Sequence, residues 1–139
     1  MKTTVMVATV ILLCLAGSAQ AKEINMKAIA QIESSLNPLA YNQTSRATGL
    51  YQITPICLKD YNQYHTKNLT LNDMKNPALC YKVAYWYMNI RIPQLLHYYG
   101  HKDTIENRLT AYNAGIKWVG KKLPSETTNY IRKYNEAIK

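Results

Sequence analysis

Three pairs of a cap-type residue and a proline divide the chain, and they restrict its fold more than any other feature. Thr54-Pro55 and Asn76-Pro77 each combine a preferred N-cap residue with proline at the first helical position. They predict a short helix after the first pair and a longer helix after the second. Asn37-Pro38 should instead end a helix, because the residue before proline is pushed out of the α region. These pairs favour a mainly helical fold.

Apolar residues at helical spacing, such as Ile29 and Ile32, predict a first helix over residues 23–35. Residues 39–53 are polar with isolated apolar side chains, and they predict a loop with one short extended piece. No repeat, linker or low-complexity segment interrupts the chain after its N-terminal stretch. Residues 22–139 are therefore predicted to form a single domain.

Three further features predict where helices begin and end in the second half of the chain. Pro93 should kink or end the long helix, because proline lacks a backbone donor. Asp103 with Glu106 three residues later resembles a capping box, and Gly115 is a typical C-terminal stop. Ser125 should cap a last helix near the end of the chain.

Residues 1–21 are predicted to be a secretory signal peptide. A positive start is followed by an apolar run from Val5 to Ala16, and Ala19-Gln20-Ala21 has the small residues of a cleavage site. The run is shorter than the ~20 apolar residues of a membrane-spanning helix, although an uncleaved N-terminal anchor is the alternative. We expect cleavage after Ala21, export to the periplasm or the medium, and no transmembrane segment in the processed protein.

The charge of the chain predicts an anionic partner. Lys and Arg number 17 against 8 Asp and Glu, which gives a net charge of +9, or about +8 once Lys2 is removed with the signal peptide. Export argues against nucleic acid, and the basic residues are scattered rather than gathered in a stripe. The composition also excludes a disulfide-dense miniprotein, a collagen-like chain and a multi-span membrane protein.

Cys57 and Cys80 are the cysteines that remain after signal cleavage. In an oxidising compartment such a pair can form a disulfide, and we predict this bridge. Two buried thiols that pack as small hydrophobic side chains are the alternative.

Glu33 is the candidate for acid–base chemistry. At 100° per residue it lies about 40° from Ile29 and about 20° from Met26, at the edge of the apolar face of the first predicted helix. It also falls in the last turn, where the helix dipole disfavours a carboxylate. Partial burial would act in the same direction, so we expect a raised pKa, suited to a proton donor near neutral pH.

Four segments resemble the soluble lytic transglycosylase catalytic domain family, and they occur in the family's order over nearly all of residues 22–139. They are Glu33-Ser34 with Asn37-Pro38, Gly49-Leu50-Tyr51-Gln52-Ile53 with Pro55, Ala111-Tyr112-Asn113-Ala114-Gly115, and Glu126-Thr127 with Tyr130-Ile131. The resemblance implies a lysozyme-like fold, mainly α-helical with a small β element and a substrate cleft between two lobes.

The resemblance also implies a reaction. It is cleavage of the β-1,4 bond between N-acetylmuramic acid and N-acetylglucosamine in peptidoglycan, with formation of 1,6-anhydro ends. The family's single catalytic acid corresponds to Glu33, and the C6 hydroxyl of the sugar replaces the second carboxylate that most glycosidases need. No cofactor and no metal are expected.

Five residues of the matching segments are predicted to bind substrate or orient Glu33. The amides of Gln52 and Asn113 can donate to and accept from sugar groups, and Tyr112 and Tyr130 can orient Glu33 or stack on a sugar ring. Ser34 would hydrogen-bond near Glu33 or the substrate. Backbone hydrogen bonds and packing are the alternative roles for these residue types.

Three positions depart from the family pattern, and one of them is Pro93, which interrupts a helix that is usually continuous in the family. Tyr51 stands where Met or Phe is usual, at a position that tends to line the cleft, and Arg46 replaces a residue that is commonly small. Both could alter the shape of the sugar subsites.

The preferred hypothesis is a monomeric lytic transglycosylase that acts on peptidoglycan glycan strands, without a nucleic-acid partner. A hydrolytic goose-type lysozyme is the first alternative, and the scarcity of acids speaks against it. A glycan-binding or structural module of an envelope machine is the second. A secretion, pilus or conjugation apparatus would be the partner for local wall opening by so small an enzyme.

Overall fold

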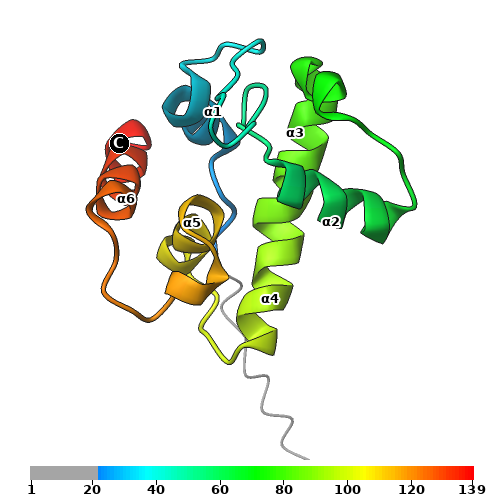
Figure 1. Ribbon diagram of the computed structural model, residues 1–139. Helices are drawn as coiled ribbons and strands as arrows, with labels where there is room; N and C mark the ends of the chain where they lie inside the picture. The colour runs from blue at the N-terminus through cyan, green and yellow to red at the C-terminus, as the bar shows by residue number, and fades with distance from the viewer. Residues whose placement is uncertain (1–21) are drawn as a thin grey trace, which may run out of the picture.

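The computed structural model describes residues 22–139, which form a mainly helical domain (Figure 1). The predicted signal peptide, residues 1–21, lies outside the described residues. Within residues 22–139, no helix combines the length and the apolar character needed to cross a membrane. The predicted fold class is confirmed, and the β element consists of isolated antiparallel bridges of Thr48 with Tyr41 and Ile53.

Helix α1 (Met26–Ser34) is shorter at both ends than the predicted helix over residues 23–35. The side chain of Asn25 caps its start by accepting a hydrogen bond from the N–H of Ala28 at 3.1 Å. The helix ends because Ser35 adopts a left-handed conformation with φ of 53°. Its last turn, which carries Glu33, is therefore fixed by local backbone geometry before the chain reaches the Asn-Pro pair.

Helices α2 (Pro55–His65) and α3 (Pro77–Trp86) begin at the two predicted pairs. The side chains of Thr54 and Asn76 accept hydrogen bonds from backbone N–H groups of the first turns, as N-caps do. Between the two helices lies the 3₁₀-helix η1 (Leu71–Lys75). The prediction of both helix starts is confirmed.

Pro93 does not end the helical path. A kink and an end of the helix were the two outcomes predicted at this residue, and the second does not occur. Helix α3 passes into the π-helical turn η2 (Tyr87–Arg91) and then into α4 (Ile92–Tyr98), and Figure 1 shows α3 and α4 as one column. Ile92 donates its N–H to the carbonyl of Tyr87, five residues earlier. This wider turn lies directly before the proline, where a regular α-helical bond is lost.

The predicted capping box of Asp103 and Glu106 is wrong. The N-cap of α5 (Ile105–Asn113) is Thr104, whose hydroxyl oxygen accepts from a first-turn N–H at 3.1 Å. Asp103 instead forms a two-bond ion pair with the buried Arg108, at 2.6 and 2.7 Å. The carboxylate of Asp103 is therefore bonded to the guanidinium of Arg108 and does not cap the helix.

The predicted stop at Gly115 is confirmed, because Gly115 follows α5 with φ of 100°, which an L-residue rarely adopts. A short 3₁₀-helix, η3 (Ile116–Trp118), and a turn lead to α6 (Ser125–Ala137). The prediction that Ser125 caps this helix is wrong: the N-cap is Pro124, which has no side chain that can accept a hydrogen bond.

The main core fills the space between α1, α2, α3, α5 and α6, and helix α3 runs through the middle of it (Figure 1). Its fully buried side chains come from every part of the described chain and include Ile29, Ile53, Met74, Val83 and Leu109. A smaller cluster of Ile92, Leu96, Ala111 and Val119 joins α4 to α5. The core thereby fixes the ends of α1, α5 and α6 relative to one another.

Cys57 and Cys80 are both buried in this core as free thiols, so the predicted disulfide is not present in the structure. Burial raises the pKa of each thiol, and it does so strongly for Cys57. A thiol with a raised pKa is a poor nucleophile for disulfide exchange. The arrangement is the alternative that the sequence left open, two thiols that pack as small hydrophobic side chains.

Candidate active site

Glu33 lies in the last turn of α1, partly buried, and faces α6. The hydroxyl of Tyr130, a residue of α6 that is 6 % exposed, donates a hydrogen bond to Oε1 of Glu33 at 2.8 Å. The two residues are 97 positions apart in the sequence, and the packing of α1 against α6 brings them together. The carboxyl group is thus held by a side chain from a separate helix.

Burial raises the pKa of Glu33 from 4.5 to about 7, although the hydrogen bond from Tyr130 acts in the opposite direction. The predicted direction is confirmed, with burial as the principal cause. A carboxyl group with this pKa is protonated in a large fraction of molecules at neutral pH. It can therefore donate a proton and later accept one.

Tyr112, from α5, lies close enough to Glu33 for the charge of Glu33 to affect the ionisation of its hydroxyl. Burial first, and the negative charge of Glu33 second, raise the pKa of Tyr112 well above its usual value, and the same two causes raise that of Tyr130. Both hydroxyls therefore remain protonated and act as donors. That of Tyr112 donates to the backbone carbonyl of Tyr51 at 2.5 Å.

Tyr51 itself is buried, at 6 % exposure, and its ring packs edge-on against Tyr81 with 6.0 Å between ring centroids. The structure places Tyr51 in the core, and this residue is not among those that line the cavity of Gln52, Tyr112 and Asn113. Its influence on the site passes through its carbonyl, which holds Tyr112.

Ser34 joins the end of α1 to the loop that precedes α2. Its hydroxyl lies 2.8 Å from the carbonyl oxygen of Leu50 and 3.1 Å from that of Ala30, and it can donate to either. The bond to Leu50 connects residues 16 positions apart, so it fixes the loop against the helix end that carries Glu33. This contact is the backbone role that the sequence left open beside substrate binding.

Ser34→Ala should lower the free energy of unfolding by about 1–2 kcal/mol, because the Leu50 carbonyl loses its side-chain donor. Urea unfolding monitored by circular dichroism would measure the change. Ser35→Ala is the matched control, since the Ser35 hydroxyl makes no hydrogen bond within residues 22–139. An equal effect of the two substitutions would contradict this role.

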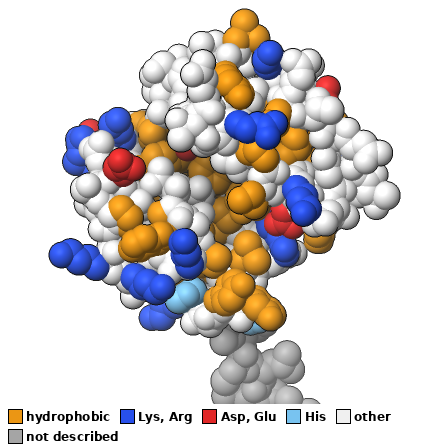
Figure 2. All heavy atoms as spheres, in the orientation of Figure 1, with side chains coloured by type: hydrophobic (Ala, Val, Ile, Leu, Met, Phe, Trp, Pro, Cys, Tyr) orange, Lys and Arg blue, Asp and Glu red, His pale blue; other side chains and the backbone are white. Residues whose placement is uncertain are grey.

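A cavity of about 280 Å³ brings together three of the predicted residues, Gln52, Tyr112 and Asn113. Gln52 donates through Nε2 to the carbonyls of Gly49 and Ala40, at 3.0 and 3.3 Å. Glu33, Ser34 and Tyr130 are not among the residues that line this cavity. On the face of the molecule drawn in Figure 2, hydrophobic side chains gather in a hollow across the middle.

Asn113 is oriented by α6, because its Oδ1 accepts a hydrogen bond from the hydroxyl of the buried Thr127 at 2.8 Å. This bond uses the acceptor end of the amide and leaves Nδ2 as the donor that a sugar oxygen could reach. Thr127 belongs to the fourth matching segment, but no role was predicted for it from the sequence. Its place one turn before Tyr130 on α6 is the signal that could have indicated a supporting role.

Ile56 is a second residue that the sequence interpretation missed. It lines the same cavity, in the first turn of α2, and its relative solvent exposure is 79 %. The sequence around an apolar residue that follows a helix-starting proline does not indicate whether its side chain is exposed. Only the structure therefore identifies Ile56 as a residue of the cavity. It offers an apolar contact at the rim of the cavity.

The described residues contain no group of three or more His, Cys, Asp or Glu side chains that could hold a metal ion. The site in residues 22–139 instead consists of a carboxyl group, two tyrosine hydroxyls and two side-chain amides. These groups can transfer a proton and hydrogen-bond neutral polar substituents.

Comparison with protein families places residues 16–135 in the transglycosylase SLT domain. The match includes all six residues predicted to act in catalysis or substrate binding. No curated protein sequence and no solved structure matches the chain.

Proposed function

The chain belongs to the transglycosylase SLT domain family, whose activity is directed at peptidoglycan, and from this premise we propose that it is a lytic transglycosylase. It cleaves the β-1,4 bond between N-acetylmuramic acid and N-acetylglucosamine, with Glu33 as the single acid and base. The observation that carries the proposal is a carboxyl group with a pKa of about 7, hydrogen-bonded by Tyr130.

In the first step, protonated Glu33 gives its proton to the glycosidic oxygen that leaves with N-acetylglucosamine. The bond from C1 of N-acetylmuramic acid to that oxygen breaks, and positive charge develops at C1. Glu33 becomes a carboxylate, which the hydrogen bond from Tyr130 stabilises.

In the second step, the Glu33 carboxylate takes the proton of the C6 hydroxyl of the same muramic acid residue. The C6 oxygen attacks C1 and closes the 1,6-anhydro ring. Glu33 ends protonated, as it began, and no water is consumed. Among the described residues, Tyr130 is the side chain whose hydrogen bond shifts the pKa of Glu33, and no second carboxylate contributes to that shift.

Gln52 and Asn113 line the cavity beside Tyr112, and we assign them to the N-acetyl and hydroxyl groups of the sugars. Ser34 and Tyr112 act mainly by holding the loop before α2, since both hydroxyls lie within hydrogen-bond distance of its carbonyls. A substrate of this kind lies outside the cytoplasm. Residues 1–21 would direct export as a cleaved signal peptide.

The proposed reaction is tested by digesting purified sacculi and weighing the released muropeptides. Wild-type protein should release products that end in 1,6-anhydro-muramic acid, and Glu33→Gln should release none. Products with reducing ends would indicate a hydrolase instead. An unchanged sacculus would contradict both activities.

The rate of cleavage should fall as the pH rises above about 7, because Glu33 must be protonated to release the leaving oxygen. Tyr130→Phe should move this fall to higher pH, since its hydroxyl lowers the pKa of Glu33. It should also reduce kcat by about tenfold, the effect of one lost hydrogen bond to a charged group. The pH dependence of kcat/KM on soluble glycan strands measures the shift.

Tyr134→Phe is the matched control. Tyr134 is also a buried tyrosine of α6, but its hydroxyl oxygen accepts from the backbone N–H of Asn25 at 2.9 Å. It should alter stability and leave the pH profile in place. A profile that is unchanged in Tyr130→Phe would show that this tyrosine does not act on Glu33.

A further inference from the structure

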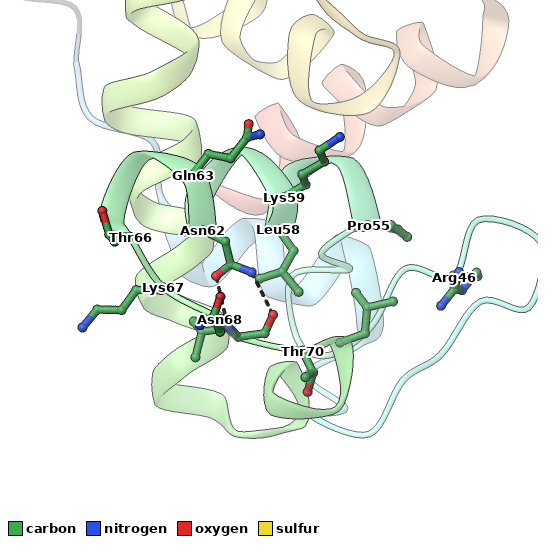
Figure 3. A pocket seen from close by; sticks show the side chains of 12 residues that line it. Arg46, Pro55, Leu58, Lys59, Asn62, Gln63, Thr66, Lys67, Asn68 and Thr70 are labelled. Atoms are coloured by element: carbon green, nitrogen blue, oxygen red, sulfur yellow. Dashed lines mark hydrogen bonds between the residues drawn. The ribbon is translucent and has the colours of Figure 1, made fainter.

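A larger cavity, of about 710 Å³, lies along α2 and shares no lining residue with the cavity of Gln52, Tyr112 and Asn113. It is a groove between one face of α2 and the segment of residues 66–71 that follows it, and Figure 3 shows side chains of both around it. The residues that line it include the cations Arg46, Lys59 and Lys67 and no acid. We call it the basic groove.

The basic groove is preformed, because hydrogen bonds fix its two walls to each other. Asn62 of α2 donates through Nδ2 to the carbonyl of Leu69 at 2.8 Å and accepts through Oδ1 from the N–H of Leu69 at 3.1 Å (Figure 3). The N–H of Lys67 donates to the backbone carbonyl of Asn62 at 2.9 Å. A ligand would not have to order these walls on binding.

The groove continues past Arg46 into a second cavity of about 380 Å³, which shares Arg46 and Leu71 with it. The second cavity adds Lys75 and the exposed side chains of Leu39 and Tyr41, again without an acid. The residues that line the two cavities include four cations and no acid, beside apolar surface, and the nearby carboxylate of Asp73 is bonded to the N–H and the hydroxyl of Thr70 at the edge of the groove. They are suited to a ligand that carries several negative charges on a partly apolar chain.

The first turn of α2 separates the basic groove from the cavity of Gln52, Tyr112 and Asn113. Thr54 and Ile56 line that cavity, whereas Pro55 and Leu58 line the groove. The groove and that cavity share no lining residue, so a ligand in the groove leaves the cavity of Gln52, Tyr112 and Asn113 open.

We propose that the basic groove binds the stem peptide of peptidoglycan through its carboxylates. This inference rests on the proposed function, since the stem peptide is attached to the muramic acid of that substrate. The size of the groove favours it: 710 Å³ is in the range of pockets for small ligands. A stable protein partner would need an interface of roughly 1,000 Å² or more. Polar side chains such as Asn62 and Gln63 can bond the peptide backbone.

The test compares two substrates, soluble glycan strands that carry stem peptides and the same strands freed of peptides by an amidase. Lys59→Gln with Lys67→Gln should raise KM for the peptide-bearing strands about fivefold or more, because two exposed charge pairs are lost. The double variant should leave KM for the peptide-free strands unchanged. Lys121→Gln with Lys122→Gln, which removes the same charge from an exposed turn outside the groove, should change neither value.

An equal rise of KM for both substrates would overturn the proposal, because the lysines would then attract glycan in general. An unchanged KM for both would also overturn it and would leave the groove to an acidic segment of a partner protein. Anhydro products must appear from the peptide-free strands in every arm. Their absence with wild-type protein would contradict the proposed function and not only the peptide site.

Discussion

Glu33→Gln is expected to lower the rate of glycan cleavage by about 10²–10⁴-fold, the contribution of a positioned general acid. Glutamine has nearly the shape of protonated glutamic acid and can still accept the hydrogen bond from Tyr130, but it has no acidic proton to give. Initial rates on soluble glycan strands measure the loss. A variant that keeps most of the rate would show that another group supplies the proton.

The same substitution should stabilise the fold at alkaline pH. The pKa of Glu33 is raised from 4.5 to about 7, so its ionised form is disfavoured in the folded state, and stability present below pH 4.5 is lost as the pH rises through 7. Glutamine never ionises. The variant should therefore exceed the wild type in free energy of unfolding by up to about 3 kcal/mol at pH 8, and match it near pH 4.

Urea unfolding at the two pH values tests this difference, with Glu106→Gln as the control. Glu106 is exposed in the first turn of α5, and its substitution should change stability little at either pH. Equal stability of wild type and Glu33→Gln at pH 8 would show that the folded protein does not disfavour the carboxylate. The combination of lost activity and gained stability is typical of a residue kept for chemistry.

Gly49→Ala is expected to have the largest effect on folding, a loss of at least about 4 kcal/mol or failure to fold. Gly49 has φ of 85°, and a Cβ there would lie 2.1 Å from the carbonyl oxygen of Met74 and 2.9 Å from Sγ of Cys80. Met74 is fully buried in η1, so its backbone has no room to move. Thermal and urea unfolding measure the loss.

Gly100→Ala is the matched control for backbone strain alone. Its φ of 73° is similar, but a Cβ there would meet no atom within 4 Å. It should lose only about 1–2 kcal/mol, the cost of the left-handed conformation for a residue with a side chain. Similar losses in the two variants would show that contact with η1 does not determine the requirement for glycine at Gly49.

The sequence predicted the starts of α2 and α3 because a cap is a local device. Thr54 and Asn76 bond backbone groups two or three positions away, and those groups are present in any fold. The capping box predicted at Asp103 failed for the opposite reason. Arg108 competes for that carboxylate, and it is held by a third residue, Asn89, 19 positions earlier in the sequence.

The features of the candidate site divide in the same way, into those that the local sequence determines and those that depend on contacts between distant segments. The position of Glu33 in the last turn of a helix, at the edge of its apolar face, could be predicted from helical periodicity and from the matching segment, and burial at that edge is what raises its pKa. The contacts of Ser34 with Leu50 and of Tyr130 with Glu33 join segments 16 and 97 residues apart. No local pattern specifies which of several possible partners such a hydroxyl takes, so the three-dimensional packing is needed to decide between them.

The most direct test of the proposed chemistry is the mass of the new chain ends formed in water enriched in heavy oxygen. Attack by the C6 hydroxyl should give muramic acid ends that are lighter than hydrolysed ends by one water and carry no heavy oxygen. Incorporation of heavy oxygen at the new ends during cleavage would show that water is the nucleophile, and it would contradict the mechanism proposed for Glu33.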